Sequence, residues 1–234
     1  MLYIIGLGLN VKGISVQGLE IVKRCKRVYL ENYTVDFPYH VQELKDALNG
    51  KKILSADRDF VEGFGIIDEA KKMDVALLVY GSPLTATTHI SLIDEAKNSK
   101  VKCKIIYSAS VLDAVALTGL QLYKFGKIAS MPEFKADSFM DIVKDNQKIK
   151  AHSLILVDIG LEFPNALKQL EEAAKEYEIK LNKIVVCQVL GTQDRKISYK
   201  TIEEFREFSG VRKPYCIIIP SKLHFMEKEI LEEF

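Results

Sequence analysis

The chain has 234 residues, 48% of them hydrophobic, and its 33 Lys and Arg nearly balance its 32 Asp and Glu, for a formal net charge of +1. This hydrophobic content can form a sizeable core, which excludes a disordered chain, and the balanced charge argues against direct nucleic-acid binding. No apolar run reaches the roughly 18 residues of a membrane-spanning helix. The composition therefore predicts a cytoplasmic globular protein without a membrane partner.

The cysteines suggest neither a metal site nor a disulfide framework. There are four, at Cys25, Cys103, Cys187 and Cys216, and none forms a CxxC pair. Each lies in or beside an apolar run, where a free cysteine behaves as a small hydrophobe. We therefore expect four free, buried thiols in an intracellular protein, and no zinc.

In the first half of the chain, short apolar runs alternate with amphipathic stretches, which is typical of a mostly parallel sheet covered by helices. Strands are expected at residues 2–5, 27–30, 51–54, 75–80 and 101–106, and helices at 85–97 and 111–122. The run Val75–Val79 has no polar residue, which predicts a strand buried on both faces. Ser15 is the expected N-cap of a further helix. That helix should bury Val16, Leu19, Val22 and Cys25.

The second half repeats this character with different lengths. Helices are expected at 137–149, 163–177 and 224–231, and strands at 153–157, 183–189 and 215–219. Pro164 suits the start of its helix. The stretch Lys124–Lys135, with Gly126 and Pro132, breaks the regularity. These features predict two α/β lobes with a boundary near residues 110–135, and we assign the lobes to residues 1–112 and 113–234.

Three loops that follow predicted strands have the composition of a ligand site. They are Gly6-Leu7-Gly8 after the first strand, Tyr80–His89 after the fourth and Tyr107–Val111 after the fifth. Ligands of open α/β sheets bind beyond the carboxyl ends of the strands. The three loops are therefore expected to converge on one small-molecule site.

Single features leave alternatives open. Gly6, Gly8 and Glu31 match part of a dinucleotide-binding fingerprint, but its third glycine is replaced by Val11. A nicotinamide or flavin enzyme and a purely structural turn both remain alternatives. His224 follows another buried strand and fits a cap, a surface residue or a functional residue, whereas His89 is expected on a helix face.

Several motifs occur in one order along the chain: Leu2–Leu9, Glu31–Thr34, Gly81–His89, Ala109–Val111 with Thr118–Gln121, and Lys222–His224. Together they closely resemble the diphthine synthase family of the tetrapyrrole-methylase superfamily, from Met1 to about residue 230. The segment Ala86–His89 is the most specific single piece.

The resemblance implies two αβα lobes with S-adenosylmethionine in the cleft between them, and a homodimer. It also implies methylation of the amino group of a modified histidine on translation elongation factor 2, a step of diphthamide biosynthesis. No catalytic base is identified, and no metal is expected. The cofactor contacts implied by matching positions are Leu9, Ser82, Thr85, Ser110, Val111, Leu161, Leu190 and His224.

One position departs from the family pattern. An aspartate usually stands where this chain has Ser82, and a serine can form a hydrogen bond but supplies no charge. We therefore expect weaker cofactor binding. Two further alternatives are carbon methylation of a tetrapyrrole or corrin, and a module that binds the cofactor without activity. Ala86–His89 and Leu223-His224 favour the protein substrate.

Overall fold

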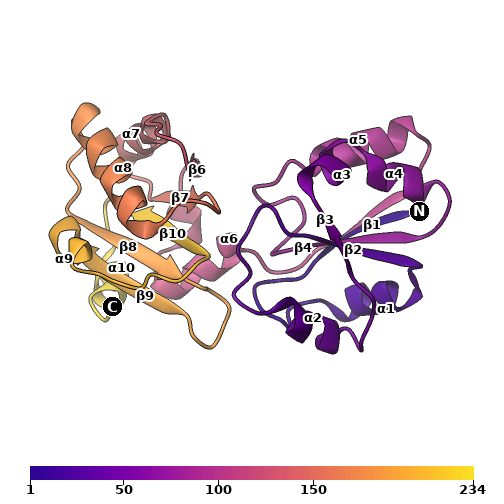
Figure 1. Cartoon of the computed structure of the whole chain (residues 1–234). Coiled ribbons are helices and arrows are strands. Elements are labelled where there is room, and N and C mark those ends of the chain that lie inside the picture. The colour runs from indigo at the N-terminus through magenta and orange to yellow at the C-terminus, as the bar shows by residue number, and fades with distance from the viewer. The chain divides into compact units, whose positions relative to one another are not determined.

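The computed structural model describes all 234 residues, and the chain divides into two units, Met1–Val111 and Leu112–Phe234 (Figure 1). The first unit has a sheet of five parallel strands in the order β3-β2-β4-β1-β5. Its strands are β1 (Leu2–Gly6), β2 (Arg27–Glu31), β3 (Leu54–Ala56), β4 (Val75–Val79) and β5 (Cys103–Ile106). As predicted, β4 is buried along its whole length.

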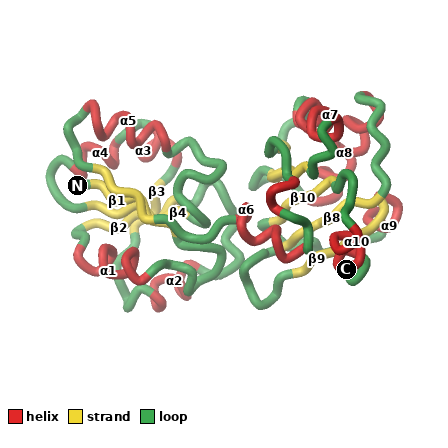
Figure 2. The backbone as a smooth tube through the Cα atoms, turned by 180° about the vertical axis from the view of Figure 1, so that it is seen from behind, coloured by secondary structure: helices red, strands yellow, loops and turns green.

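Helices cover both faces of this sheet. In Figures 1 and 2, α1 and α2 lie on one face, and α3, α4 and α5 lie on the other. Because strand side chains alternate between faces, Leu2 and Ile4 pack in one core cluster, whereas Tyr3 and Ile5 pack in the other. The helices are α1 (Val16–Arg24), α2 (Val41–Ala47), α3 (Arg58–Glu62), α4 (Gly65–Ala70) and α5 (Ile90–Asn98).

The structure corrects several expectations for this unit. Ser15 caps α1 by accepting a hydrogen bond from the Gly18 amide, as predicted. However, α1 buries Gly18, Ile21 and Val22, and Val16 is 76% exposed because the first helical residue projects away from that face. Strand β3 begins at Leu54 rather than at residue 51. Helices α2, α3 and α4 were not predicted, because helices this short leave little periodicity in the sequence.

The helix predicted from residue 85 begins only at Ile90. The residues before it form an irregular turn in which Ala86 has a φ of 54°. His89 is not on a helix face. It is the buried residue that precedes α5.

The second unit has a five-stranded sheet in the order β6-β7-β10-β8-β9. Only β6 and β7 are parallel, whereas β10 is antiparallel to both β7 and β8, and β8 is antiparallel to β9. The expectation of a mostly parallel sheet therefore holds for the first unit alone. The short connection 189–195 returns the chain as a hairpin, which parallel strands do not allow. The strands are β6 (Ala129–Met131), β7 (Ser153–Val157), β8 (Lys183–Gln188), β9 (Lys196–Thr201) and β10 (Tyr215–Ile219).

Helices α7 and α8 lie on one face of this sheet and α10 lies on the other (Figure 2). The predicted helix 111–122 is a short α6 followed by a 3₁₀ helix, and it ends at Gly119, where φ is 80°. Strands β6 and β9 and helix α9 were missed. The helices are α6 (Val111–Ala114), α7 (Phe139–Lys148), α8 (Phe163–Glu176), α9 (Ile202–Arg206) and α10 (Phe225–Leu231), with 3₁₀ helices at Val115–Thr118 and Leu122–Lys124.

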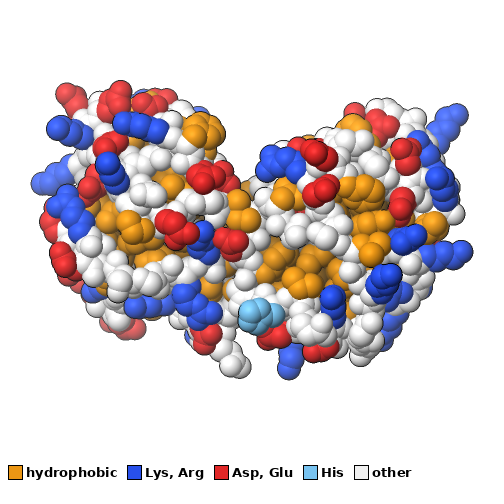
Figure 3. Space-filling model, viewed as in Figure 1, with side chains coloured by type: hydrophobic (Ala, Val, Ile, Leu, Met, Phe, Trp, Pro, Cys, Tyr) orange, Lys and Arg blue, Asp and Glu red, His pale blue; other side chains and the backbone are white.

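The remaining features bear on the surface and the thiols. Acidic and basic side chains are mixed over the visible face of each unit (Figure 3). All four cysteines are free, and Cys103 is half-buried rather than buried. No helix is both long enough and apolar enough to cross a membrane.

Candidate functional site

The loops after β1 and β4 are joined directly. The amide of Gly8 donates to the carbonyl of Gly81 at 3.1 Å, and the amide of Gly81 donates to the carbonyl of Gly8 at 3.0 Å. The φ angles of these two residues are 68° and 70°. Glycine adopts such angles without steric cost, so the two glycines allow the loops to pair.

The loop after β5 packs against the same pair. The hydroxyl of Ser108 donates to the carbonyl of Gly13 at 2.8 Å. A Cβ at Gly6 would lie 2.6 Å from the Gly81 carbonyl oxygen and 3.0 Å from Cβ of Ser108, so no side chain fits there. The three loops therefore converge, as predicted, because β4, β1 and β5 are adjacent parallel strands.

Five of the residues implied as cofactor contacts belong to this loop cluster. Leu9 follows Gly8, and its carbonyl accepts a hydrogen bond from the Tyr80 hydroxyl at 3.1 Å. Ser82 follows Gly81, and its carbonyl accepts from the Thr85 amide at 3.1 Å, which closes the turn. Ser110 ends the loop after β5, and Val111 begins α6.

The loop cluster fits a nucleoside-type cofactor. A Cβ at Gly81 would meet nothing nearer than the Ala109 carbonyl oxygen at 3.8 Å and Cα of Ser110 at 3.9 Å. A ligand can therefore approach this backbone closely. The turn Gly81–Thr85 and the loop Tyr107–Val111 carry hydroxyls but no charged side chain, so recognition here would rely on backbone groups and neutral hydrogen bonds.

The dinucleotide alternative loses its acidic residue. Glu31 is buried, and its Oε1 accepts from the Tyr33 amide at 3.2 Å while its Oε2 accepts from the Thr34 hydroxyl at 2.9 Å. The carboxylate thus stabilises the turn that follows β2. It does not project as a ribose-binding acid would.

In the second unit the structure brings together two of the three implied contacts. Leu161 and Leu190 lie at the edge where β7 and β8 end. There the Tyr215 hydroxyl donates to the Leu161 carbonyl at 2.9 Å. Leu190 directly follows Val189, whose amide donates to the Pro214 carbonyl. His224 follows β10, which runs antiparallel to both strands, so it lies beyond the opposite ends of the strands.

His224 precedes α10 and caps it. The Met226 amide donates to Nδ1 of His224 at 3.4 Å, and the exposed imidazole packs on Phe225 with ring centroids 4.2 Å apart. The observed role is therefore local, and it corresponds to the capping alternative for a lone histidine.

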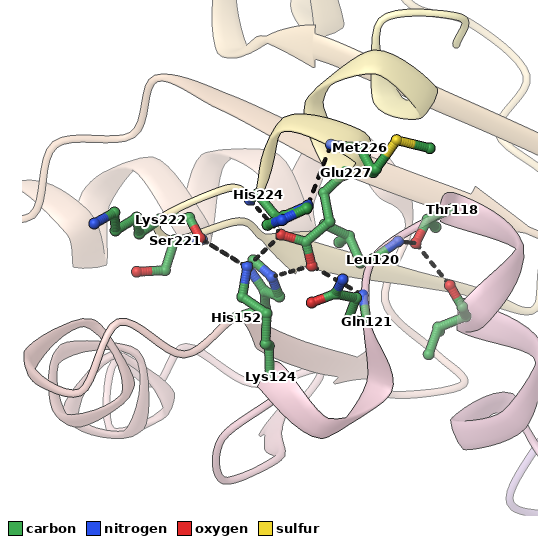
Figure 4. A network of polar contacts seen from close by, with 11 residues as sticks. Thr118, Leu120, Gln121, Lys124, His152, Ser221, Lys222, His224, Met226 and Glu227 are labelled. Atoms are coloured by element: carbon green, nitrogen blue, oxygen red, sulfur yellow. Dashed lines mark hydrogen bonds and ion pairs between the residues drawn. The ribbon is translucent and has the colours of Figure 1, made fainter.

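A buried carboxylate organises the chain around His224 (Figure 4). Glu227 is fully buried and accepts hydrogen bonds from the His224 amide at 2.7 Å and from the Gln121 amide at 3.0 Å. It also forms an ion pair with Lys124. Through these contacts Glu227 ties α10 to the segment before β6.

His152 completes this network from the start of β7. The Ser221 amide donates to its Nδ1 at 3.0 Å, so the ring proton is on Nε2, which donates to Glu227 at 3.2 Å. Burial lowers the pKa of His152, although its bond to Glu227 opposes that effect. His152 is therefore neutral near pH 7.

Burial by itself would raise the pKa of Glu227. The hydrogen bonds from the His224 amide, Lys124 and the Gln121 amide outweigh it and lower the pKa to about 2. The sequence holds one signal for this network, the spacing of His224 and Glu227, which suits a capping box. Lys124 and His152 gave none, because their proximity depends on the sheet.

The chain contains no group of three or more His, Cys, Asp or Glu side chains placed to hold a metal ion.

Comparison with known proteins shows which family the chain matches. Residues 1–206 match the family model described as Tetrapyrrole (Corrin/Porphyrin) Methylases. A relative from Saccharomyces cerevisiae, named diphthine methyl ester synthase, is 36% identical over all of this chain and 89% of its own length. A relative from Methanococcus maripaludis, named diphthine synthase, is 33% identical over 99% of this chain and 98% of its own length.

A solved structure agrees with these matches. A crystal structure of diphthine synthase superposes with a TM-score of 0.91 and 33% sequence identity, and the match covers 100% of this chain and 95% of that one. The likeness thus extends over all of this chain and nearly all of the other.

Proposed function

The chain belongs to the diphthine synthase family of tetrapyrrole methylases, and we propose that it methylates the amino group of the modified histidine on translation elongation factor 2. It is a methyltransferase of diphthamide biosynthesis that uses S-adenosylmethionine. The observation that carries the proposal is the convergence of the three loops at Gly8 and Gly81. The names of the full-length relatives favour a protein substrate over a tetrapyrrole.

The residues of the loop cluster bind and orient. S-adenosylmethionine, when bound, supplies an activated methyl group on its sulfonium. Because the cofactor carries this activation, the protein mainly contributes alignment and exclusion of water. Leu9 and Val111 would pack on the cofactor. Ser82, Thr85 and Ser110 would hold it through hydroxyl and backbone groups.

We assign the contacts of the second unit as separate proposals. Leu161 and Leu190 lie where β7 and β8 end, and they would give apolar contacts. His224 follows the last residue of β10, which lies where β7 and β8 begin. His224→Ala and Leu161→Asp should each weaken cofactor binding. A variant that binds normally would remove its residue from the site.

The principal experiment has two stages. Calorimetry with S-adenosylmethionine, S-adenosylhomocysteine and nicotinamide dinucleotides tests the cofactor. Transfer of a labelled methyl group to elongation factor 2 carrying the unmethylated histidine intermediate then tests the activity. Binding without transfer would indicate a module without activity, and transfer only to a tetrapyrrole would overturn the proposed substrate.

Two substitutions test the loop cluster. Ser110→Phe should abolish binding of S-adenosylhomocysteine with the fold intact, and unchanged binding would exclude this loop. Ser82→Asp should tighten binding by about 1–3 kcal/mol if the new carboxylate meets the cofactor's ammonium. Weaker binding would mean that the turn is adapted to serine.

A second candidate concerns the acceptor atom. The Saccharomyces relative is named for a methyl ester and the Methanococcus relative is not. Methylation of a carboxylate oxygen, in addition to the amine, is therefore a candidate activity. Mild alkali removes an ester methyl as methanol but leaves N-methyl groups, so product masses before and after alkali separate the two.

We also propose that the enzyme is a homodimer and acts in the cytoplasm, where translation factors work. Exposed apolar side chains such as Tyr123 (83%) and Phe225 (70%) on the second unit would suit a subunit contact. Analytical ultracentrifugation tests the dimer, and a monomer at micromolar concentration would refute it.

A further inference from the structure

We infer that His89 is a positioning residue, which holds the turn Gly81–Thr85 in the shape that binds the cofactor. This inference rests on the proposed function of that turn. His89 lies outside the set of cofactor contacts, and it acts through the carbonyl of Pro83.

The geometry is a double contact on one oxygen atom. Nδ1 of His89 lies 3.1 Å from the Pro83 carbonyl oxygen, and the Thr87 hydroxyl donates to the same oxygen at 2.8 Å. A carbonyl oxygen has two lone pairs and can accept both bonds. Two side chains that follow the turn thus fold back to fix its centre.

The turn needs such contacts. Between Pro83 and His89 the chain passes through Ala86 with a φ of 54°, a left-handed angle that a residue with a Cβ adopts only at a cost. The turn is also neither helix nor strand, so few backbone bonds support it. The side chains of Thr87 and His89 supply what the backbone lacks.

The neighbour of His89 fixes the role of Nδ1. The Pro83 carbonyl can only accept, so Nδ1 carries a proton and donates it. The other ring nitrogen, Nε2, is buried without a partner in a side chain that is only 1% exposed. An unpaired buried polar atom is unfavourable for folding. An apolar residue would stabilise the core better, which argues that the imidazole is kept for its Nδ1 contact.

A displaced Pro83 would disturb the loop cluster. Its Cδ lies 3.0 Å from where a Cβ would stand on Gly6, so the ring fills the space beside β1. Ser82 and Gly81 precede it directly, and Gly81 is bonded to Gly8. The bond from His89 therefore acts on the backbone that faces the proposed cofactor.

The test compares His89→Leu with His89→Asn in the full chain. Leucine removes the donor, whereas the Asn side-chain amide can occupy the position of Nδ1. Losing one hydrogen bond predicts that His89→Leu weakens binding of S-adenosylhomocysteine about tenfold, and raises KM for S-adenosylmethionine more than it changes kcat. His89→Asn should bind within about threefold of wild type. The thermal midpoint of His89→Leu should not fall.

His40→Leu is the matched control, because His40 is an exposed histidine that also precedes a helix of the first unit. It should leave binding unchanged. Thr87→Val removes only the second donor to the Pro83 carbonyl and should also weaken binding of S-adenosylhomocysteine. It replaces His89→Leu as the test variant if His89→Leu does not fold. In the ligand-free chain, amide hydrogen exchange of Leu84 and Thr85 should be faster in His89→Leu and in Thr87→Val than in wild type.

The outcomes separate the two proposals. Failure of the wild type to bind S-adenosylhomocysteine would overturn the proposed function. Slow exchange in His89→Leu would overturn the positioning role, as would wild-type affinity in that variant. Equal weakening by His89→Asn and His89→Leu would also overturn it, because the Nδ1 donor would then not matter.

Discussion

Glu227→Gln replaces a buried carboxylate with an amide of nearly the same size. The glutamine keeps one oxygen to accept hydrogen bonds. Its amino group replaces either Oε2, which accepts from Lys124 and the His224 amide, or Oε1, which accepts from the Gln121 amide and His152, and so faces two donors in either case. Lys124 also loses its charged partner. We expect the second unit to lose stability at neutral pH, because this carboxylate joins three segments of that unit.

The magnitude follows from the pKa of Glu227. Folding lowers this pKa from 4.5 to about 2, and a tenfold change in an acid dissociation constant corresponds to about 1.4 kcal/mol. The charged form thus contributes at most about 3 kcal/mol to the free energy of unfolding. Removing one partner of a buried ion pair costs a similar amount, about 3–5 kcal/mol.

The pH dependence has a definite sign. Because the pKa is lower in the folded state, the stabilisation is complete above pH 4.5 and is lost as the pH falls toward about 2. Protonated Glu227 resembles glutamine. The difference between wild type and Glu227→Gln should therefore be about 3 kcal/mol at neutral pH and shrink through this window.

Urea unfolding followed by circular dichroism, at pH values from neutral to about 3, measures this difference. The chain has no tryptophan, so intrinsic fluorescence is a weaker probe. Glu229→Gln, at an exposed position of the same helix, is the control and should change stability little. A loss of stability that stays constant across the pH range would refute the reasoning, because the charge would then contribute nothing.

Three further predictions concern the turns and the thiols. Gly81→Ala has room for its methyl group but a φ of 70°, so we expect about 1–2 kcal/mol of destabilisation with weaker S-adenosylhomocysteine binding by calorimetry; unchanged affinity would contradict it. Gly119→Ala should destabilise the second unit by about 2 kcal/mol or more in urea, because its Cβ would collide with Ile230 at a φ of 80°. A double-mutant cycle with Ile230→Ala should show coupling, and strict additivity would rule out the collision. Burial raises the pKa of Cys25 to about 11. The hydrogen bond that the Cys187 thiol donates to the cysteine opposite it on β10, together with burial, raises the pKa of Cys187. Both thiols should react slowly with a thiol reagent that releases a coloured product, until urea unfolds the chain. Rapid reaction in the native protein would show that the two thiols are not protected.

Hydrophobic patterning was enough to locate the central strands and the longest helix. The apolar runs of β4 and β10 and the periodicity of α8 each exceed what a loop would carry, so their positions followed from the sequence. Polar and glycine residues after parallel strands also predicted that the loops at Gly8 and Gly81 converge. In such a sheet the strand direction alone brings these loops to one edge.

The partners of buried polar side chains followed from tertiary structure alone. The sequence placed His89 on a helix face, and nothing in it linked Glu227 to Lys124 or to His152. These contacts depend on how the turn before α5 folds back and on which strands neighbour β10. The antiparallel order of the second sheet likewise separates His224 from Leu161, although both follow buried strands. A sequence pattern records burial and local geometry, whereas the pairing of residues far apart along the chain is set by the sheet that joins them.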